Sequence, residues 1–153
     1  MAAAVPQGYR GATPYICCRH ATDAIRFYVT AFGATEVYRL ADPSGKVGHA
    51  EIRIGEAVIM LSDEFPDLGV RCPLALGGTA VTLHVYVDDV DALALRAVEA
   101  GAKVLRPLEN QFYGDRTVKL EDPFGHAWIF ATHLDDVCEK EMRERAVKMF
   151  GHS

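Results

Sequence analysis

The sequence predicts an α+β fold in which two tandem βαβββ modules form curled, mixed β-sheets with a cup-shaped cavity. A helical stretch occurs twice: residues 23–35 read "DAIRFYVTAFGAT" and residues 91–103 read "DALALRAVEAGAK". One strand-like run precedes each copy, and three follow it. The 153 residues suit a single domain, and a composition that is 50% hydrophobic allows the two modules to share one core.

The first module begins with a short apolar strand in "PYICC", followed by a helix from Thr22 to Phe32. We expect Thr22 or Asp23 to cap this helix, and Gly33 to end it in a left-handed conformation. Three strands follow, in "TEVYRL", "VGHAEIRI" and "AVIMLS", with turns at "DPSG" and "GE" between them.

The second module repeats this order. Its first strand is "VTLHVYV", and its helix presents Val90, Leu93 and Ala97 on one face before it ends at Gly101. Three strands follow, in "KVLRP", "RTVKLE" and "HAWIFAT", the last two joined by the turn "DPFG". Trp128 is expected in the core, and an amphipathic helix from Glu139 to Phe150 closes the sequence.

The predicted organisation is therefore one integrated domain with five segments. They are a flexible N-terminal lead over residues 1–12, a first module over 13–62, a connector over 63–80, a second module over 81–134, and a C-terminal helical segment over 135–153. Two prolines and three glycines interrupt the periodicity of the connector.

Composition argues against several function classes. The net charge is −5 with no basic cluster, so binding to nucleic acid is not expected. No apolar run approaches the ~20 residues that span a membrane, and the start of the sequence lacks the features of a signal peptide. The four cysteines include no C-x-x-C pair, so free thiols are expected rather than disulfides or zinc ligands. A cytoplasmic protein is the resulting expectation.

Alternation along the strands predicts which side chains the helices leave uncovered. In "GHAEIRI" the apolar residues face the helix, which leaves His49, Glu51 and Arg53 on the other face. The same rule applies to the second module. The predicted cup consists of His49, Glu51, Arg53, Met60, His84, Tyr86 and Lys119, with Tyr15 nearby and with Phe112 and Tyr113 as a lid. Two alternatives stay open: a solvated sheet face, and packing of Phe112 and Tyr113 on the linker or on a partner chain.

The paired modules, the helix end "FYVTAFGA", and the motifs "VDDVDAL" and "EDPFGHAWIF" together resemble the vicinal oxygen chelate superfamily. This superfamily includes glyoxalase I, bleomycin-resistance proteins and extradiol dioxygenases. The resemblance covers about residues 13–138 and is greatest to a PhnB-like branch. It implies a homodimer in which cups are completed across chains.

In metal-using relatives, the resemblance implies ligands on the first and last strand of each module. The matching positions here are Thr13, Met60, Thr82 and Ile129. None is a histidine or a carboxylate, the donors that a divalent ion needs at such a site. No cofactor is therefore predicted, although an off-register metal site made from His49, His84, Glu51 and Glu121 stays an alternative.

The sequence thus favours a protein that binds an unidentified small molecule in a cup without the usual metal. The alternative is a lyase, isomerase or dioxygenase-type enzyme of the same superfamily. Such an enzyme would use an off-register metal or a His/Glu acid–base pair.

Overall fold

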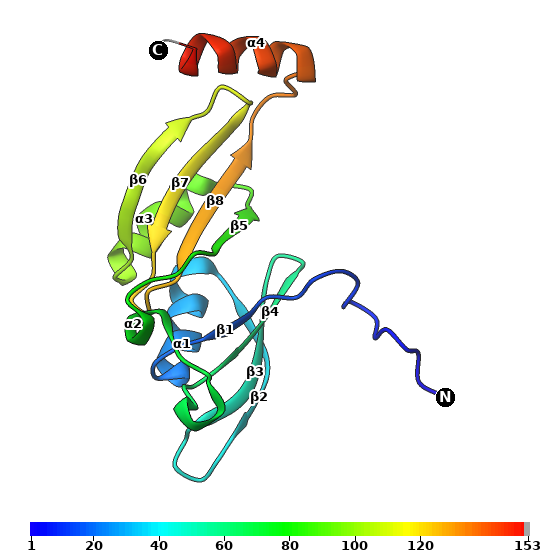
Figure 1. Ribbon diagram of the computed structural model, residues 1–153, viewed down its shortest axis with the longest axis vertical. Helices are drawn as coiled ribbons and strands as arrows, with labels where there is room; N and C mark the ends of the chain where they lie inside the picture. The colour runs from blue at the N-terminus through cyan, green and yellow to red at the C-terminus, as the bar shows by residue number, and fades with distance from the viewer. Residues whose placement is uncertain (152–153) are drawn as a thin grey trace.

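The computed structural model describes residues 1–151 and contains two mixed four-stranded sheets (Figure 1). In the first sheet the strand order is β1-β4-β3-β2, with β1 parallel to β4 and the other neighbours antiparallel. Its elements are β1 (Tyr15–Cys17), α1 (Ala21–Phe32), β2 (Thr35–Ala41), β3 (Val47–Ile54) and β4 (Ala57–Ser62).

The second sheet repeats this topology in the order β5-β8-β7-β6, again with a parallel first pair. Its elements are β5 (Thr82–Tyr86), α3 (Val90–Ala100), β6 (Lys103–Asn110), β7 (Asp115–Glu121) and β8 (Ala127–His133). The two βαβββ modules predicted from the sequence are confirmed, and the sheets are not closed into a barrel. Between the modules lie a 3-10 turn (Pro66–Leu68) and the short helix α2 (Pro73–Leu76).

The start of α1 differs from the sequence-based expectation. Neither Thr22 nor Asp23 caps the helix, because the N-cap position belongs to His20, which adopts a left-handed φ of 61° and contributes no side-chain cap. Instead, Asp63 reaches over from the end of β4 and accepts a hydrogen bond from the Ala21 N–H at 2.8 Å. The cap therefore comes from 42 residues away, a separation that local sequence rules do not cover. The predicted end at Gly33 is confirmed, with φ of 68°.

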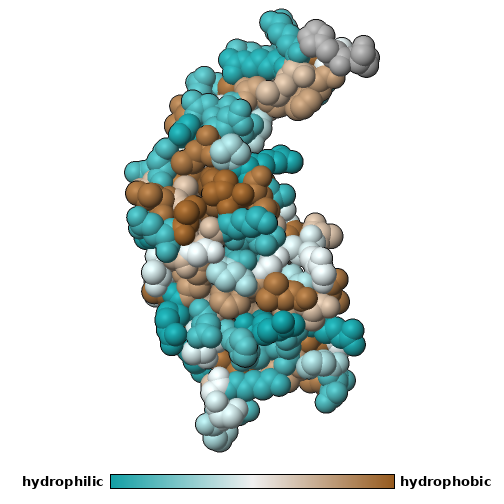
Figure 2. Space-filling model, turned by 90° about the vertical axis from the view of Figure 1, so that its left-hand side faces the viewer, coloured by the Kyte–Doolittle hydropathy of each residue, from teal (hydrophilic) through white to brown (hydrophobic). Residues whose placement is uncertain are grey.

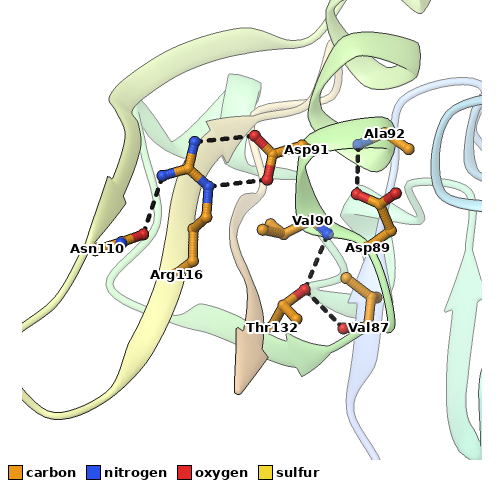
Figure 3. Close-up of polar contacts among 8 residues, drawn as sticks. All are labelled: Val87, Asp89, Val90, Asp91, Ala92, Asn110, Arg116 and Thr132. Atoms are coloured by element: carbon orange, nitrogen blue, oxygen red, sulfur yellow. Dashed lines mark hydrogen bonds and ion pairs between the residues drawn. The ribbon is translucent and has the colours of Figure 1, made fainter. Parts of the chain in front are cut away.

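Side chains tie the start of α3 to its own sheet (Figure 3). Asp89 caps the helix by accepting from the Ala92 N–H at 3.0 Å. Arg116 on β7 forms a two-pronged ion pair with Asp91 through Nε and Nη2, at 2.8 and 2.9 Å. The Thr132 hydroxyl links the first helical N–H to the carbonyl just after β5, with 2.9 Å on each side. These contacts fix α3 against one face of the second sheet.

The two modules share one core because α1 and α3 pack against each other as well as against their own sheets. Trp128 is fully buried, as expected, with its ring 5.5 Å from Tyr28 and 5.0 Å from Phe32 of the other module. The carboxylate of Asp122 accepts from the Tyr28 hydroxyl at 2.6 Å and from the Trp128 indole at 2.9 Å. Aromatic packing and this buried carboxylate therefore join the modules.

The last helix, α4 (Glu139–Phe150), has the predicted bounds and crosses the end of the second sheet (Figure 1). Figure 2 shows that its outer side is hydrophilic, whereas a more hydrophobic side is turned toward the rest of the molecule. Phe150 packs edge-on against Phe112, and Arg145 donates to the Phe112 carbonyl at 2.9 Å. Within residues 1–151, no helix has the length and apolar character needed to cross a membrane.

Candidate functional site

The helix-covered face of each sheet follows the predicted alternation. On β3, Ala50 and Ile52 are fully buried, and on β7 Val118 and Leu120 are equally inaccessible. Val81 is an exception, because it precedes β5 and is 63% exposed. The opposite faces, which we call the open faces, carry the polar candidates.

The open face of the first sheet holds a cluster of hydrogen bonds centred on Glu51. This carboxylate is only 4% exposed, although it lies on the face without a helix. It accepts from the hydroxyl of Tyr9, from Tyr38 Oη at 3.2 Å and from His49 Nε2 at 3.3 Å. Tyr15 Oη contacts His49 Nδ1 at 2.7 Å. The hydrogen bond from Tyr9 is the main reason that the pKa of Glu51 is lowered, with burial opposing it.

Two members of this cluster were not predicted from the sequence. Tyr9 lies in the N-terminal lead, which gives no periodic signal, yet its side chain reaches the open face. Tyr38 lies opposite Glu51 because β2 has an irregular register between Glu36 and Tyr38. A bulge shifts the face of every later residue, so alternation within β2 alone cannot assign Tyr38.

The strand registers place four open-face residues of the first sheet in one row. Met60 pairs with Tyr15 on one side and with Glu51 on the other, and Glu51 pairs with Tyr38. We call the four residues Tyr15, Met60, Glu51 and Tyr38 the first row. Arg53 lies two residues beyond Glu51, is exposed, and pairs with Thr35 and Val58.

The second sheet has a matching row with different chemistry. Ile129 pairs with His84 on one side and with Lys119 on the other, and Lys119 pairs with Arg106. We call His84, Ile129, Lys119 and Arg106 the second row. Within the described part of the chain, neither Lys119 nor Arg106 forms an ion pair. This open face is therefore cationic at its centre.

A second hydrogen-bonded cluster lies at the end of this sheet next to α4. Asp115 is 3% exposed and accepts from the Tyr86 hydroxyl at 2.7 Å. The ring of His133 lies between two carboxylates, with Nδ1 2.7 Å from Asp115 and Nε2 2.8 Å from Asp136. Burial opposes ionisation of Asp115, but its bonds to His133 and Tyr86 outweigh this and lower its pKa. The bond to Asp115 is the main cause of a raised pKa for His133, followed by the bond to Asp136.

Sequence reasoning missed Asp115, His133 and Asp136. The predicted strands began one residue after Asp115 and ended one residue before His133. Extending each strand by that residue would have placed both side chains on the open face by alternation. Asp136 lies beyond the strand, where no periodic rule applies.

A cavity of about 490 Å³ opens between this cluster and α4. Its polar side consists of Tyr86, Asp115 and His133, and its apolar side includes Val137 and Met142. Tyr113, one of the two predicted lid residues, also lines it, together with Asp136 and Cys138. Phe112, the other, contacts α4 through Phe150. Tyr113 thus faces the cavity, whereas Phe112 supports the helix above it.

The structure brings the predicted cup residues together in two separate groups. His49, Glu51, Met60 and Tyr15 are neighbours on the first sheet, and His84, Tyr86 and Lys119 lie on the second. Between the groups, residues 1–151 show no hydrogen bond, ion pair or ring contact. Within one chain, the residues predicted to form one cup therefore lie on two different sheets, and a shared cup stays a prediction.

The positions that the superfamily resemblance assigns to metal ligands do not fit a divalent ion. Met60 and Ile129 lie at the centres of the two rows and offer a thioether and a hydrocarbon. Thr13 and Thr82 offer neutral hydroxyls. Hard or borderline cations require several imidazole or carboxylate donors. These four positions therefore lack the donors that a divalent metal requires.

The duplicated topology and the open faces agree with a family match. The sequence model of the Glyoxalase/Bleomycin resistance protein/Dioxygenase superfamily matches residues 12–130. The chain belongs to this superfamily. His133, Asp136 and α4 lie after the matched region, so the cavity beneath α4 is built partly from residues that the superfamily pattern does not describe.

Individual relatives support the same assignment. The chain is 42% identical over 134 residues to the uncharacterized protein Mb0911c of Mycobacterium bovis, covering 86% of this chain and 88% of the relative. Its structure is similar to that of TioX from Micromonospora sp. ML1, with a TM-score of 0.64 and 28% identity over 81% of this chain and 100% of the other. The Arabidopsis thaliana protein At5g48480 gives a TM-score of 0.63 and 28% identity, covering 80% of this chain and 98% of the other.

Proposed function

We propose that this superfamily member binds a small molecule on its open faces without the divalent metal that resemblance to metal-using relatives implies. The observation that carries the proposal is the contrast between the two kinds of position on these faces. The positions that match metal ligands in the relatives hold Thr13, Met60, Thr82 and Ile129, whereas the same open faces carry hydrogen-bonded clusters around Glu51 and Asp115.

Aromatic side chains supply contact area for a ligand on these faces. Of the six tyrosines in the sequence, only Tyr28 belongs to the shared core. The other five line the open faces or the cavity beneath α4: Tyr9, Tyr15, Tyr38, Tyr86 and Tyr113. A tyrosine offers a flat apolar ring and a polar hydroxyl at a low cost in conformational entropy, which suits binding of small organic molecules.

A homodimer belongs to the same proposal. Among the described residues the two groups share no hydrogen bond, ion pair or ring contact, so a second chain is a natural source of the missing part of each cup. The exposed rings of Tyr15, Tyr38 and Tyr86 on the open faces provide surface that a second copy could cover.

Metal analysis of the purified, dialysed protein tests the proposal. We expect well under one equivalent of zinc, nickel, manganese or iron, because the four inherited positions provide no imidazole or carboxylate. Native mass spectrometry of the same sample should show added mass from a co-purified small molecule, or none, but no metal-sized increment. Stoichiometric metal that survives dialysis and is lost in His49→Gln or His84→Gln would show an off-register metal site and refute the proposal.

A further inference from the structure

The cavity beneath α4 has an asymmetric construction that identifies a class of ligand. One side is apolar, with Val137 and Met142, and Tyr113 adds a ring. The other side holds the imidazole of His133, whose Nε2 lies 2.8 Å from the exposed carboxylate of Asp136. Its volume of about 490 Å³ is within the range of small-molecule sites.

The contacts of His133 define its protonation. Both ring nitrogens face carboxylate oxygens, at 2.7 Å for Asp115 and 2.8 Å for Asp136. An ionised carboxylate only accepts hydrogen bonds, so two such bonds require a proton on each ring nitrogen, as in the imidazolium form. Asp115 is buried and also holds the Tyr86 hydroxyl, so it is the permanent partner. Asp136 has a fully exposed side chain and is the replaceable one.

The chain positions this exposed carboxylate through its backbone. The carbonyl of Gly114 accepts from the N–H groups of Leu134 and Asp135, at 2.9 and 3.1 Å. Gly114 has a φ of 98°, and a Cβ atom there would lie 2.1 Å from the Asp135 carbonyl oxygen. Only glycine allows this close approach. The segment after β8 is therefore fixed at Gly114, and the Asp136 side chain beyond it can swing into solvent.

Two cationic side chains lie on the same open face as the cluster around Asp115. Arg106 and Lys119 of the second row lie on the same open face without ion-pair partners among the described residues. His84 is close enough to Asp115 to help lower its pKa, and Arg106 is close enough to Tyr113 to oppose the rise in pKa that burial causes there. With Asp136 displaced, Asp115 is the only carboxylate among the described residues that line the cavity, and it is paired with His133.

We propose that the cavity beneath α4 binds a small monocarboxylate with an apolar body, whose carboxylate replaces that of Asp136 on His133 Nε2. The apolar body lies against Val137, Met142 and the ring of Tyr113. This inference rests on the proposed small-molecule function and names the chemistry of one of its subsites.

The site depends on pH through His133. Both of its carboxylate contacts raise the pKa of the ring, so the imidazolium form persists above the ordinary histidine range and is lost as pH rises further. A simple carboxylic acid stays ionised throughout, so any loss of affinity at high pH reports on the protein. The titratable and charged groups around the ring are Asp115 on β7, Tyr86 on β5, Asp88 just after β5, Tyr113 in the β6–β7 loop, and Asp136 and Cys138 before α4, with His84 of β5 acting on Asp115.

The test measures binding of 3-phenylpropionate to the full chain by calorimetry at pH 6 and at pH 9, with 3-phenylpropionamide as the neutral control. We expect saturable binding of the acid at pH 6, at least about tenfold weaker binding at pH 9, and no saturable binding of the amide. Absence of saturable binding of the acid at pH 6, or equal binding of acid and amide, overturns the inference.

Matched variants localise the binding. His133→Asn keeps an N–H that can reach Asp115 but removes the outward donor, so affinity at pH 6 should fall at least about tenfold. His133→Gln keeps an outward N–H without the charge, so weaker binding should persist without its pH dependence. Asp136→Asn removes the competing carboxylate and should strengthen binding about threefold or more, whereas Asp135→Asn, its exposed neighbour, should have no effect.

These outcomes separate the inference from the proposed function. Binding of the acid that is insensitive to all four variants overturns the site beneath α4 but leaves a small-molecule-binding protein. Tighter binding in Asp136→Asn supports the site even where His133→Asn is unstable. Stoichiometric metal in the dialysed protein refutes the metal-free function, whatever these variants show.

Discussion

The first row, on the first sheet, consists of Tyr15, Met60, Glu51 and Tyr38. The second row, on the second sheet, consists of His84, Ile129, Lys119 and Arg106. The positions correspond pair by pair through the same register. One row centres on a buried carboxylate that accepts hydrogen bonds, and the other carries cations without ion-pair partners in the described chain. The helix-covered faces of both modules are apolar, whereas the two rows on the open faces differ in the sign of their charge.

The turns that follow the same D-P-x-G pattern diverge in a second way. Asp42, in "DPSG", is exposed and accepts only from the backbone and hydroxyl of its own turn. Asp122, in "DPFG", is 3% exposed and accepts from its own turn and from Tyr28 and Trp128. The aspartate of this turn therefore has only a local role in the first module, whereas in the second module Asp122 also joins the two modules. We call this contact the joint at Asp122.

The largest expected effect breaks this joint. Asp122→Ala removes the acceptor of two buried side-chain donors and two turn N–H groups, each worth ~1–3 kcal/mol when left unsatisfied. We expect the free energy of unfolding to fall by roughly 3 kcal/mol or more in a denaturant titration. Asp42→Ala is the matched control and should cost about 1 kcal/mol or less, because water can replace an exposed turn acceptor. Similar losses in both variants would contradict the assigned asymmetry.

An intermediate effect separates the two open-face clusters. Asp115→Asn removes the carboxylate behind His133, so the pKa of His133, followed by its ring NMR signals, should fall toward the ordinary histidine value. In the unmodified protein, the bond between His133 and Asp115 stabilises the fold at pH values below the ordinary histidine pKa. This contribution to stability is lost as the pH rises through the raised pKa of His133. Glu51→Gln in the other sheet should leave the titration of His133 unchanged. An unaltered His133 titration in Asp115→Asn would show that the contact does not exist in solution.

The smallest expected effect concerns the repeated aspartate at the start of each copied helix. Asp91 binds Arg116 through two nitrogens, but both side chains are partly exposed, at 54% and 31%. Asp91→Ala should therefore cost ~0.5–1 kcal/mol of unfolding free energy. Asp23 has only an exposed contact with Arg26 in its own helix, so Asp23→Ala should cost ~0–0.5 kcal/mol. Equal losses in thermal or denaturant unfolding would remove this difference between the modules.

Sequence periodicity predicted the fold closely because strand alternation and helix repeats are local properties. Gly33 and Gly101 mark the ends of α1 and α3, and the apolar faces of β3 and β7 lie where expected. The cap that Asp63 supplies to α1 was not predictable in this way, because it depends on where β4 ends in space.

The candidate site was predicted only in part. His49, Glu51, His84 and Tyr86 lie on open faces, as alternation indicates. Their separation into two groups depends on how α1 packs against α3, which no strand pattern encodes. Asp115 and His133 were not predicted as site residues because the predicted strand ends were wrong by one residue, and strand ends are where boundary prediction is least reliable. Whether the predicted residues contact a ligand stays a prediction.

The joint at Asp122 also has a consequence for synthesis of the protein. Tyr28 packs against Phe124 and Trp128 and bonds to Asp122, all of which follow it by more than 90 residues. On the ribosome, the first module therefore emerges with its aromatic helix face uncovered, and it stays so until nearly the whole chain has been translated. At typical elongation rates of ~5–20 residues per second, that interval lasts on the order of 5–20 seconds. A nascent chain of this kind depends on prompt completion, or on a chaperone that covers the same face, to avoid association with its neighbours.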